Sequence, residues 1–249
     1  GVYFRNLFDS DKDYFDLISN EHAFQFLTES NKPNMAFRKG IYLTKVEEVN
    51  DEINFNLLRC SSNLSGPTDN FRETDNGIIN NMNSIADHFF KEKTEFNRVL
   101  AQIYENSQVW DENNTVRSDK KAKIKAHSDK TKDMSKHALI AFCTFYKSYL
   151  NGFGDEHLSQ AAKAKDSLFD YHMHNRSILT KLRFRLKPIV TDPSYAKTVD
   201  IVLYQNSAFV IPMSTNRLYT HEIVPSSLPV DKIPIRLGYV VRCSKQKAV

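Results

Sequence analysis

The sequence predicts an α+β domain in which strands dominate and the core is a β-sandwich or a β-barrel. Aromatic residues make up 12% of the 249 residues, with 17 Phe and 11 Tyr, which favours a large aromatic core, a strand-rich core, or both. One segment has the apolar spacing of a helix, whereas several shorter segments alternate between apolar and polar residues as half-buried strands do. We expect helical material at the beginning of the chain and strands in most of the remainder.

Apolar spacing predicts one or two short amphipathic helices within residues 1–30 and, most clearly, a helix over residues 78–90. Strands are expected over these ranges: 36–45 with a turn at Gly40, 53–60, 96–104, 122–129, 138–150, 177–190, 199–213 with a break at 205–207, and 235–243. Polar and turn-forming residues predict loops at 61–77 and 105–119, and a polar helix or loop at 155–166.

The chain is mildly basic, with a formal charge of +4 and a pI near 8.8. This charge permits an anionic partner but does not require one. Cys60, Cys143 and Cys243 are far apart and odd in number, so they predict buried thiols in a reducing compartment, the cytoplasm or the nucleus. No secretory leader opens the chain, and no apolar run approaches the roughly 20 residues of a membrane span. The sequence does not indicate an oligomeric state.

A candidate metal site begins with His127 and Asp129. The segment around them alternates as a strand does, so both side chains are expected on one face. His221 follows a later strand and supplies a third ligand. Two His and one carboxylate leave positions open on the ion, which suits non-haem Fe(II) that must also bind a co-substrate and oxygen. His172 and His174 form a competing pair, since two His on one strand face also bind metal.

A candidate anion site follows the distal His. Arg236 and Arg242 are six residues apart and would share one strand face. Each guanidinium presents a planar fork to a carboxylate, so the pair suits a dicarboxylate. Two Arg on a strand face are more often solvated, and it is their place 15 and 21 residues after His221 that favours a site.

Together these motifs resemble the AlkB-like branch of the Fe(II)- and 2-oxoglutarate-dependent dioxygenases. Residues 127–130 are similar to that family's metal-binding HxD segment, and residues 216–223 to the stretch with the distal His. The Arg pair is similar to its RxxxxxR signature, and residues 96–104 to a strand with a 2-oxoglutarate-contacting Tyr. The resemblance covers roughly residues 55–245. The chain departs from the pattern in its gap of 94 residues between the first and the distal His (221 − 127), and at these positions: Gln102, Glu222 and Gly238.

The resemblance implies a single dioxygenase domain with a double-stranded β-helix (jelly-roll) core over residues 96–249. Residues 1–95 would supply N-terminal helices, strands and a substrate lid, and an insertion would lie around 150–176. The implied site has Fe(II) on its three ligands, O2 beside it, 2-oxoglutarate on Arg236 with support from Tyr104, and Arg242 near the metal-side carboxylate. The implied activity is oxidative demethylation of N-alkylated nucleic-acid bases, presented in a single strand or flipped from a duplex.

Two alternatives stay open: the same chemistry on a small molecule or a protein side chain, and a catalytically silent nucleic-acid-binding module. The candidate substrate residues are Trp110, Lys125, Lys130 and Arg217. Trp110 would stack on a base or, as we favour, anchor its loop on the core. The lysines 121, 123 and 125 share strand parity with His127, so they would line an anionic channel or protect an edge strand. Arg217 would orient the substrate or brace His221.

Overall fold

The computed structural model describes residues 1–28, 35–57, 64, 68–92, 94–110, 117–147, 170–171, 176–177 and 179–248. In that part of the chain the protein is built mainly of strands, with one large and chiefly antiparallel sheet, which confirms the predicted class. Most of the expected insertion at 150–176, with His172 and His174, lies outside the described residues, as does Cys60. No described helix has both the length and the apolar character that crossing a bilayer requires.

Two sheets form the body of the protein. The large sheet has eight strands, in this order: β1 (Val2–Phe4), β16 (Ser207–Pro212), β11 (Leu139–Tyr146), β18 (Arg236–Arg242), β7 (Arg98–Tyr104), β3 (Met35–Thr44) and β2 (Gln25–Thr28), with β6 (Asp69–Asn70) parallel to β3. The small sheet has four strands, in this order: β10 (Ile124–His127), β17 (Tyr219–Val224), β14 (Lys181–Leu186) and β15 (Thr198–Val202).

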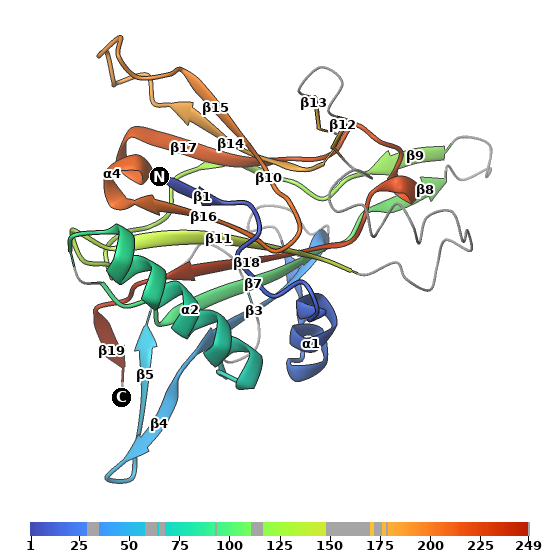
Figure 1. Ribbon diagram of the computed structural model, residues 1–249. Coiled ribbons are helices and arrows are strands. Elements are labelled where there is room, and N and C mark those ends of the chain that lie inside the picture. Colours follow the sequence, from blue (N-terminus) through green and yellow to red (C-terminus); the bar gives the residue numbers. More distant parts are fainter. Residues whose placement is uncertain are drawn as a thin grey trace.

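The small sheet covers one face of the large sheet, and the helices α1 (Tyr14–Glu21) and α2 (Glu73–Phe89) cover the other (Figure 1). Between the sheets, the ring of Phe184 on β14 meets Phe142 on β11 and Phe209 on β16 edge-on, at centroid distances of 6.4 and 5.6 Å. On the helix side, Tyr14 stacks on Phe145 at 5.0 Å. Alternating residues of each central strand therefore face either the other sheet or the helices.

The helix expected over residues 78–90 is confirmed, and it begins earlier, at Glu73. Its buried face has the predicted apolar spacing: Ile78, Ile79, Met82 and Ala86. The Asp75 side chain accepts the backbone N–H of Arg72 at 2.8 Å, which satisfies a donor that the first helical turn leaves open. The loop predicted over 61–77 is therefore wrong at its C-terminal end, where residues 69–70 form β6 and residues 73–77 begin α2.

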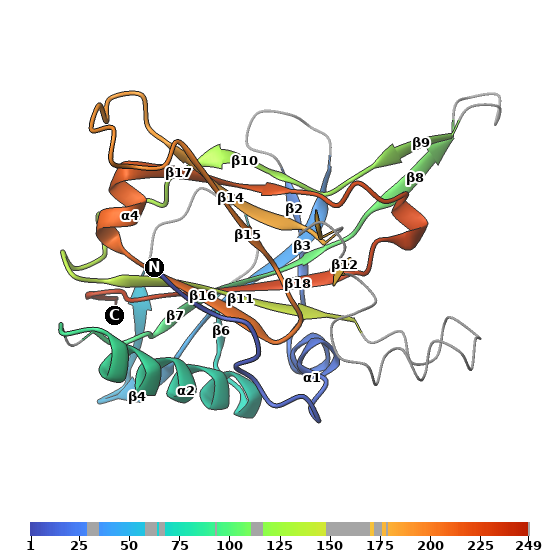
Figure 2. The same ribbon diagram turned by 45° about the horizontal axis from the view of Figure 1, so that its top comes forward.

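Three further expectations are corrected. Residues 1–30 contain two strands as well as the single helix α1. Gly40 makes no turn but lies inside β3, paired with Gln25 and Gln102. The polar segment 105–119 is not a loop throughout, because β8 (Ser107–Trp110) and β9 (Arg117–Lys120) form a hairpin. That hairpin projects from the body (Figure 2), so its residues need no apolar face to pack on a core.

The remaining elements complete the description. The expected break at 205–207 separates β15 from β16, which lie in different sheets, and Asn206 adopts a left-handed backbone there with φ of 56°. Peripheral elements are β4 (Val46–Val49), β5 (Glu52–Leu57) and β19 (Gln246–Ala248) in one small sheet, β12 (Asp170–Tyr171) with β13 (Arg176–Ser177), the helix α4 (Met213–Leu218) and the 3-10 helix η1 (Val230–Lys232).

Candidate metal centre

A bulge in β10 aims His127 into the space between the sheets. Ile124 pairs with Ile223 and His127 with His221, so three steps on β10 match two steps on β17. The extra residue puts Ile124 and His127 on the same face, because residues directly opposite in an antiparallel pair share a face. The expected common parity of His127 with the lysines 121, 123 and 125 is therefore wrong. Lys125 is exposed, and its carbonyl accepts a hydrogen bond from Nδ1 of His127 at 2.9 Å.

His221 lies on the inner face of β17, where Tyr219, His221 and Ile223 alternate as buried residues. Its ring packs against Phe142 and Phe184, at centroid distances of 5.3 and 5.8 Å. Phe184 is also its register partner on β14. The imidazole is thus fixed by two strands of its own sheet and by one aromatic ring of the opposite sheet.

Asp129 follows β10 rather than lying on it, so a shared strand face is not what brings it to His127. Asn216 of α4 holds its backbone instead: the Asn216 amide accepts the N–H of Asp129 at 3.0 Å and donates to its carbonyl at 3.1 Å. Asn216 is itself 2% exposed. This pair of hydrogen bonds positions the carboxylate between the two His side chains.

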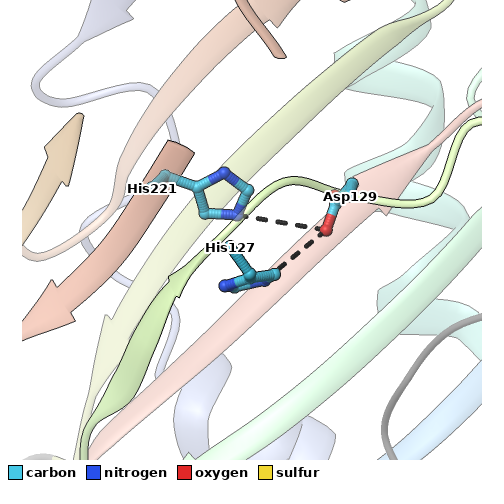
Figure 3. A group of neighbouring side chains, drawn as sticks. All are labelled: His127, Asp129 and His221. Atoms are coloured by element: carbon cyan, nitrogen blue, oxygen red, sulfur yellow. Dashed lines mark ion pairs between the residues drawn. The ribbon is translucent and has the colours of Figure 1, made fainter. Parts of the chain in front are cut away.

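The three side chains converge as the sequence predicts (Figure 3). Nε2 of His127 lies 3.8 Å from Oδ1 of Asp129, and Nε2 of His221 lies 3.9 Å from the same oxygen. All three candidate ligand atoms fall within 4.8 Å of one another. These separations are too long for hydrogen bonds. Ligand atoms that each lie about 2.0–2.2 Å from one shared ion are about 3–4 Å from one another. The separations of Oδ1 from the two imidazole nitrogens fall in that range.

The protonation states suit metal binding. Burial would raise the pKa of the Asp129 carboxyl, but the Arg242 guanidinium, helped by the two His, holds that pKa below its usual range. Nε of Arg242 donates to Oδ2 of Asp129 at 2.8 Å, which leaves Oδ1 facing the imidazoles. Burial lowers the pKa of His221 to about 4. An ionised carboxylate and a neutral imidazole are the forms that ligate metals.

A candidate anion pocket lies on the face of the large sheet that meets the small sheet. Arg236 is 4% exposed, and its Cζ lies 3.9 Å above the ring of Tyr104. Its Nη2 is buried and has no hydrogen-bond partner among the described residues. The same is true of Nε2 of Gln102, whose Oε1 accepts the Tyr104 hydroxyl at 3.2 Å. Two buried donors on neighbouring strands, with no acceptor among the described residues, favour an anionic ligand.

Gly238 makes room for this arginine. A Cβ at Gly238 would lie 2.8 Å from Nη1 of Arg236 and 3.2 Å from Cε2 of Tyr104. A small cavity at this place is lined by Arg236, Tyr104 and Ile223, among other residues. Ile223 is two residues from His221 on the same face of β17, a step of about 7 Å. The anion pocket therefore adjoins the metal centre.

The candidate substrate residues lie at different places relative to this site, and none is among the three ligands. Trp110 is 52% exposed on β8, so the expectation that it anchors a loop on the core is wrong. Lys130 is exposed directly after Asp129. Arg217 is exposed on α4, where its Nη2 donates to the carbonyl of Lys136 at 3.5 Å. Its neighbour Asn216, which the sequence did not single out, is the bracing residue.

A second group of side chains also meets the geometric requirement for an ion: Glu21, His22 and Asp75. Here Nε2 of His22 and Oδ2 of Asp75 are only 2.7 Å apart, which is a hydrogen-bond length. The two groups therefore differ in kind, and only His127, Asp129 and His221 are spaced for a metal ion.

Comparison with known proteins adds no assignment: no protein-family model matches the chain, and no curated protein matches it.

Proposed function

We propose that this protein is an Fe(II)- and 2-oxoglutarate-dependent dioxygenase that oxidatively removes alkyl groups from nucleic-acid bases. The observation that carries the proposal is the adjacency of two features on facing sheets. One is the open group of His127, Asp129 and His221, and the other is the Arg236 pocket.

The ligand set supports iron. Two imidazoles and one carboxylate on one side of an ion are the pattern of non-haem Fe(II) oxygenases, which need the other positions for co-substrate and oxygen. His127 would bind through Nε2, because its Nδ1 is engaged by a backbone carbonyl. Arg242 neutralises the far oxygen of Asp129, so the carboxylate stays ionised in a buried place.

The pocket supports a dicarboxylate co-substrate. Arg236 would pair with the carboxylate farther from the metal, stacked on Tyr104 and given space by Gly238. Gln102 would supply a further donor through Nε2. A guanidinium and an amide fix both the charge and the direction of such a ligand.

The strand order supports a double-stranded β-helix. The relevant strands in chain order, numbered 1 to 8, are β7, β10, β11, β14, β15, β16, β17 and β18. They lie in the order 1-8-3-6 in the large sheet and 2-7-4-5 in the small sheet. Two sets of four strands interleaved in this way are the order expected of a jelly roll, in which the hairpins β8–β9 and β12–β13 would be insertions.

When bound, iron with 2-oxoglutarate and O2 supplies the oxidation of a C–H bond, and 2-oxoglutarate leaves as succinate and CO2. The chain's own residues hold this chemistry in place. Phe142 and Phe184 exclude water from one side of His221, and Arg242 keeps a proton off Asp129. An N-methyl carbon hydroxylated at this site would depart as formaldehyde.

The surface near the site supports a nucleic-acid substrate. Exposed lysines flank the metal strand, at these positions: Lys123, Lys125, Lys130, Lys132 and Lys136. Such side chains bind phosphates without reading sequence. Trp110 offers an exposed ring on a projecting hairpin, and an aromatic face stacks on any base.

The test is succinate formation by anaerobically iron-loaded protein after oxygen is admitted, with and without a panel of methylated oligonucleotides. We expect one oligonucleotide to stimulate turnover and release formaldehyde, with stimulation that weakens steeply as salt is added. Asp129→Ala should abolish turnover. His137→Ala removes an exposed His outside the site and should leave turnover unchanged.

Turnover that no oligonucleotide stimulates would retain the dioxygenase and refute the nucleic-acid substrate, in favour of a protein or small molecule. Oligonucleotide binding with no turnover in the iron-loaded protein would refute the enzyme and leave a binding module.

A further inference from the structure

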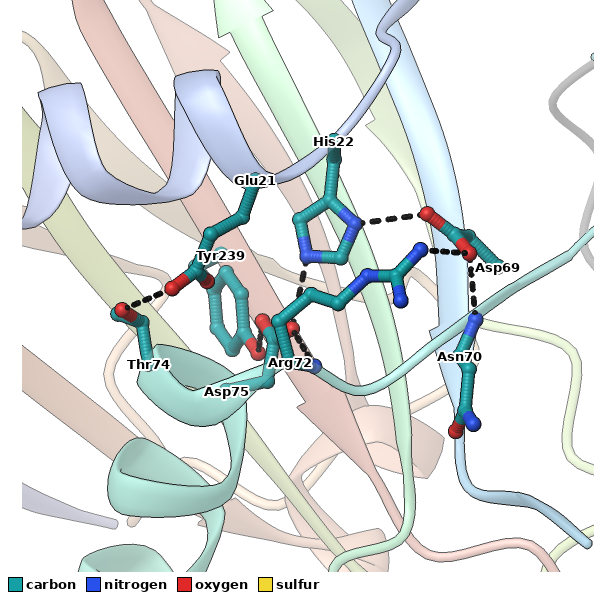
Figure 4. A network of polar contacts seen from close by, with 8 residues as sticks. All are labelled: Glu21, His22, Asp69, Asn70, Arg72, Thr74, Asp75 and Tyr239. Carbon is teal, nitrogen blue, oxygen red and sulfur yellow. Dashed lines mark hydrogen bonds and ion pairs between the residues drawn. The ribbon is translucent and has the colours of Figure 1, made fainter.

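A buried polar network lies on the helix side of the large sheet, away from the metal centre (Figure 4). His22, directly after α1, is its centre. Its Nδ1 lies 2.9 Å from Oδ2 of Asp69 on β6, and its Nε2 lies 2.7 Å from Oδ2 of Asp75 on α2. The side chains of His22 and Asp75 are 0% exposed, and that of Asp69 is 29% exposed.

The two short contacts determine the charge of His22. A neutral imidazole has only one N–H, and an ionised carboxylate can only accept. Both ring nitrogens face carboxylates at hydrogen-bond distance, so with both carboxylates ionised both nitrogens carry a proton and His22 is an imidazolium. An ion on Nε2 would have to displace the proton that this bond requires, which is why the group is closed to metal.

The other polar and charged groups around His22 come from α1, from the segment that begins α2, and from β18. Glu21 of α1 accepts the Thr74 hydroxyl at 2.8 Å. Arg72 donates its backbone N–H to Asp75 at 2.8 Å and its Nη2 to Asp69 at 3.2 Å. The Tyr239 hydroxyl of β18 donates to Oδ1 of Asp75 at 2.6 Å.

We propose that His22 is a pH-sensitive latch: as an imidazolium it fastens α1 to α2 and β6, and loss of its proton releases α1. Release follows because a neutral ring can donate to only one carboxylate, and its other nitrogen then faces an acceptor with no proton between them. For Asp75, a buried carboxylate, losing a charge-assisted bond leaves charge under-compensated. The evidence for the latch does not rest on the proposed metal chemistry.

The direction of the pH dependence follows from the pKa shifts. Burial lowers the pKa of His22, but the bonds and charges of Asp75 and Asp69 outweigh it and raise the pKa above 6.5. The stability from His22 is therefore complete below pH 6.5 and lost as pH rises through the raised pKa. Burial acts to raise the pKa of Asp69, but the hydrogen bond from His22, the largest of the opposing causes, helps to bring that pKa below 3.8. The stability that Asp69 contributes is therefore lost only in acid, as the pH falls through this lowered pKa.

The consequence reaches the arginine strand. Tyr239 lies on β18 between Gly238 and Val240, and it points to the helices while Arg236 and Arg242 point to the other sheet. Asp75 thus holds both the latch and the strand that carries the anion pocket. Opening the latch removes one of the bonds that hold Asp75 in place behind that strand.

The test is hydrogen exchange of the α1 amides between pH 6 and pH 9, corrected for intrinsic rates, in the metal-free wild type, His22→Gln and His88→Gln. His88 is an exposed His on α2 and provides the matched control. We expect the protection factors of the α1 amides to fall as pH rises in wild type and in His88→Gln. The fall should be about tenfold for each unit by which folding raises the pKa of His22. His22→Gln should show low protection that does not vary with pH.

Wild-type protection that stays constant across this range would overturn the latch, as would an unchanged pH profile in His22→Gln. If His22→Gln does not fold, an NMR titration of the wild-type His22 ring decides the question: a pKa at or below 6.5 refutes the latch. The metal alternative is tested in the double variant His127→Ala, His221→Ala. Stabilisation of this variant by Zn²⁺ that disappears when His22→Gln is added would show that the His22 group binds metal instead.

Discussion

Replacing Gly238 by Ala tests the anion pocket separately from the metal centre. The added Cβ would lie 2.8 Å from Nη1 of Arg236, closer than a Cβ approaches another atom, and 3.2 Å from Cε2 of Tyr104, which is a tight contact. The guanidinium must shift over the Tyr104 ring, because it is the flexible partner and the ring is buried. The metal ligands do not contact Gly238 and should keep their places.

The magnitude follows from the bond that is lost. A hydrogen bond to a charged group contributes about 1.5–3 kcal/mol. Misplacing Arg236 should therefore weaken 2-oxoglutarate binding about tenfold to a hundredfold. Anaerobic calorimetric titration of the iron-loaded protein measures this affinity directly, and a separate Fe(II) titration measures the metal site.

Gly77→Ala is the matched control. Gly77 lies inside α2, and a Cβ there meets nothing within 4 Å. This change should leave the 2-oxoglutarate affinity unaltered and stabilise the fold by about 0.5–1 kcal/mol, since Ala favours a helix over Gly. If Gly238→Ala bound 2-oxoglutarate as tightly as wild type, or lost Fe(II) as well, the assignment of Arg236 would be refuted.

Three other changes test the metal centre. Asn216→Ala should weaken Fe(II) binding about 10- to 100-fold in a metal titration, because it frees the backbone of Asp129; unchanged affinity would contradict this role. Arg242→Ala should lower the free energy of unfolding by about 3–5 kcal/mol in urea, since it strands a buried carboxylate, whereas Arg185→Ala at an exposed pair should cost less than about 1 kcal/mol. Metal-free protein should lose up to about 3 kcal/mol of stability as pH falls from 6.5 to about 4, because the unfolded chain binds a proton that buried His221 refuses. A similar loss in His221→Gln would contradict that cause.

The sequence predicted the elements with strong periodicity. Ile78 to Phe90 has helical spacing, and that helix exists. The alternation around Phe184 predicted a half-buried strand, and β14 has that burial pattern. The three candidate metal ligands come together in space as their residue types suggested.

The features that the sequence did not predict depend on tertiary contacts. The bulge that turns His127 inward is visible only in its pairing with β17, because a strand's parity does not reveal an extra residue. Asn216 and Asp129 are 87 residues apart, and nothing local marks their two hydrogen bonds. His22 is an ordinary His by sequence, and its charge arises only where α1, α2 and β6 meet.

The most direct test of the metal centre is the amount of Fe(II) bound by anaerobically loaded protein after desalting. We predict stoichiometric Fe(II) in wild type, His137→Ala and Arg236→Ala, and none in His127→Ala, Asp129→Ala or His221→Ala, with far-ultraviolet circular dichroism confirming that each variant is folded. Full iron content in any of the three ligand variants, or none in folded wild type, would contradict the account.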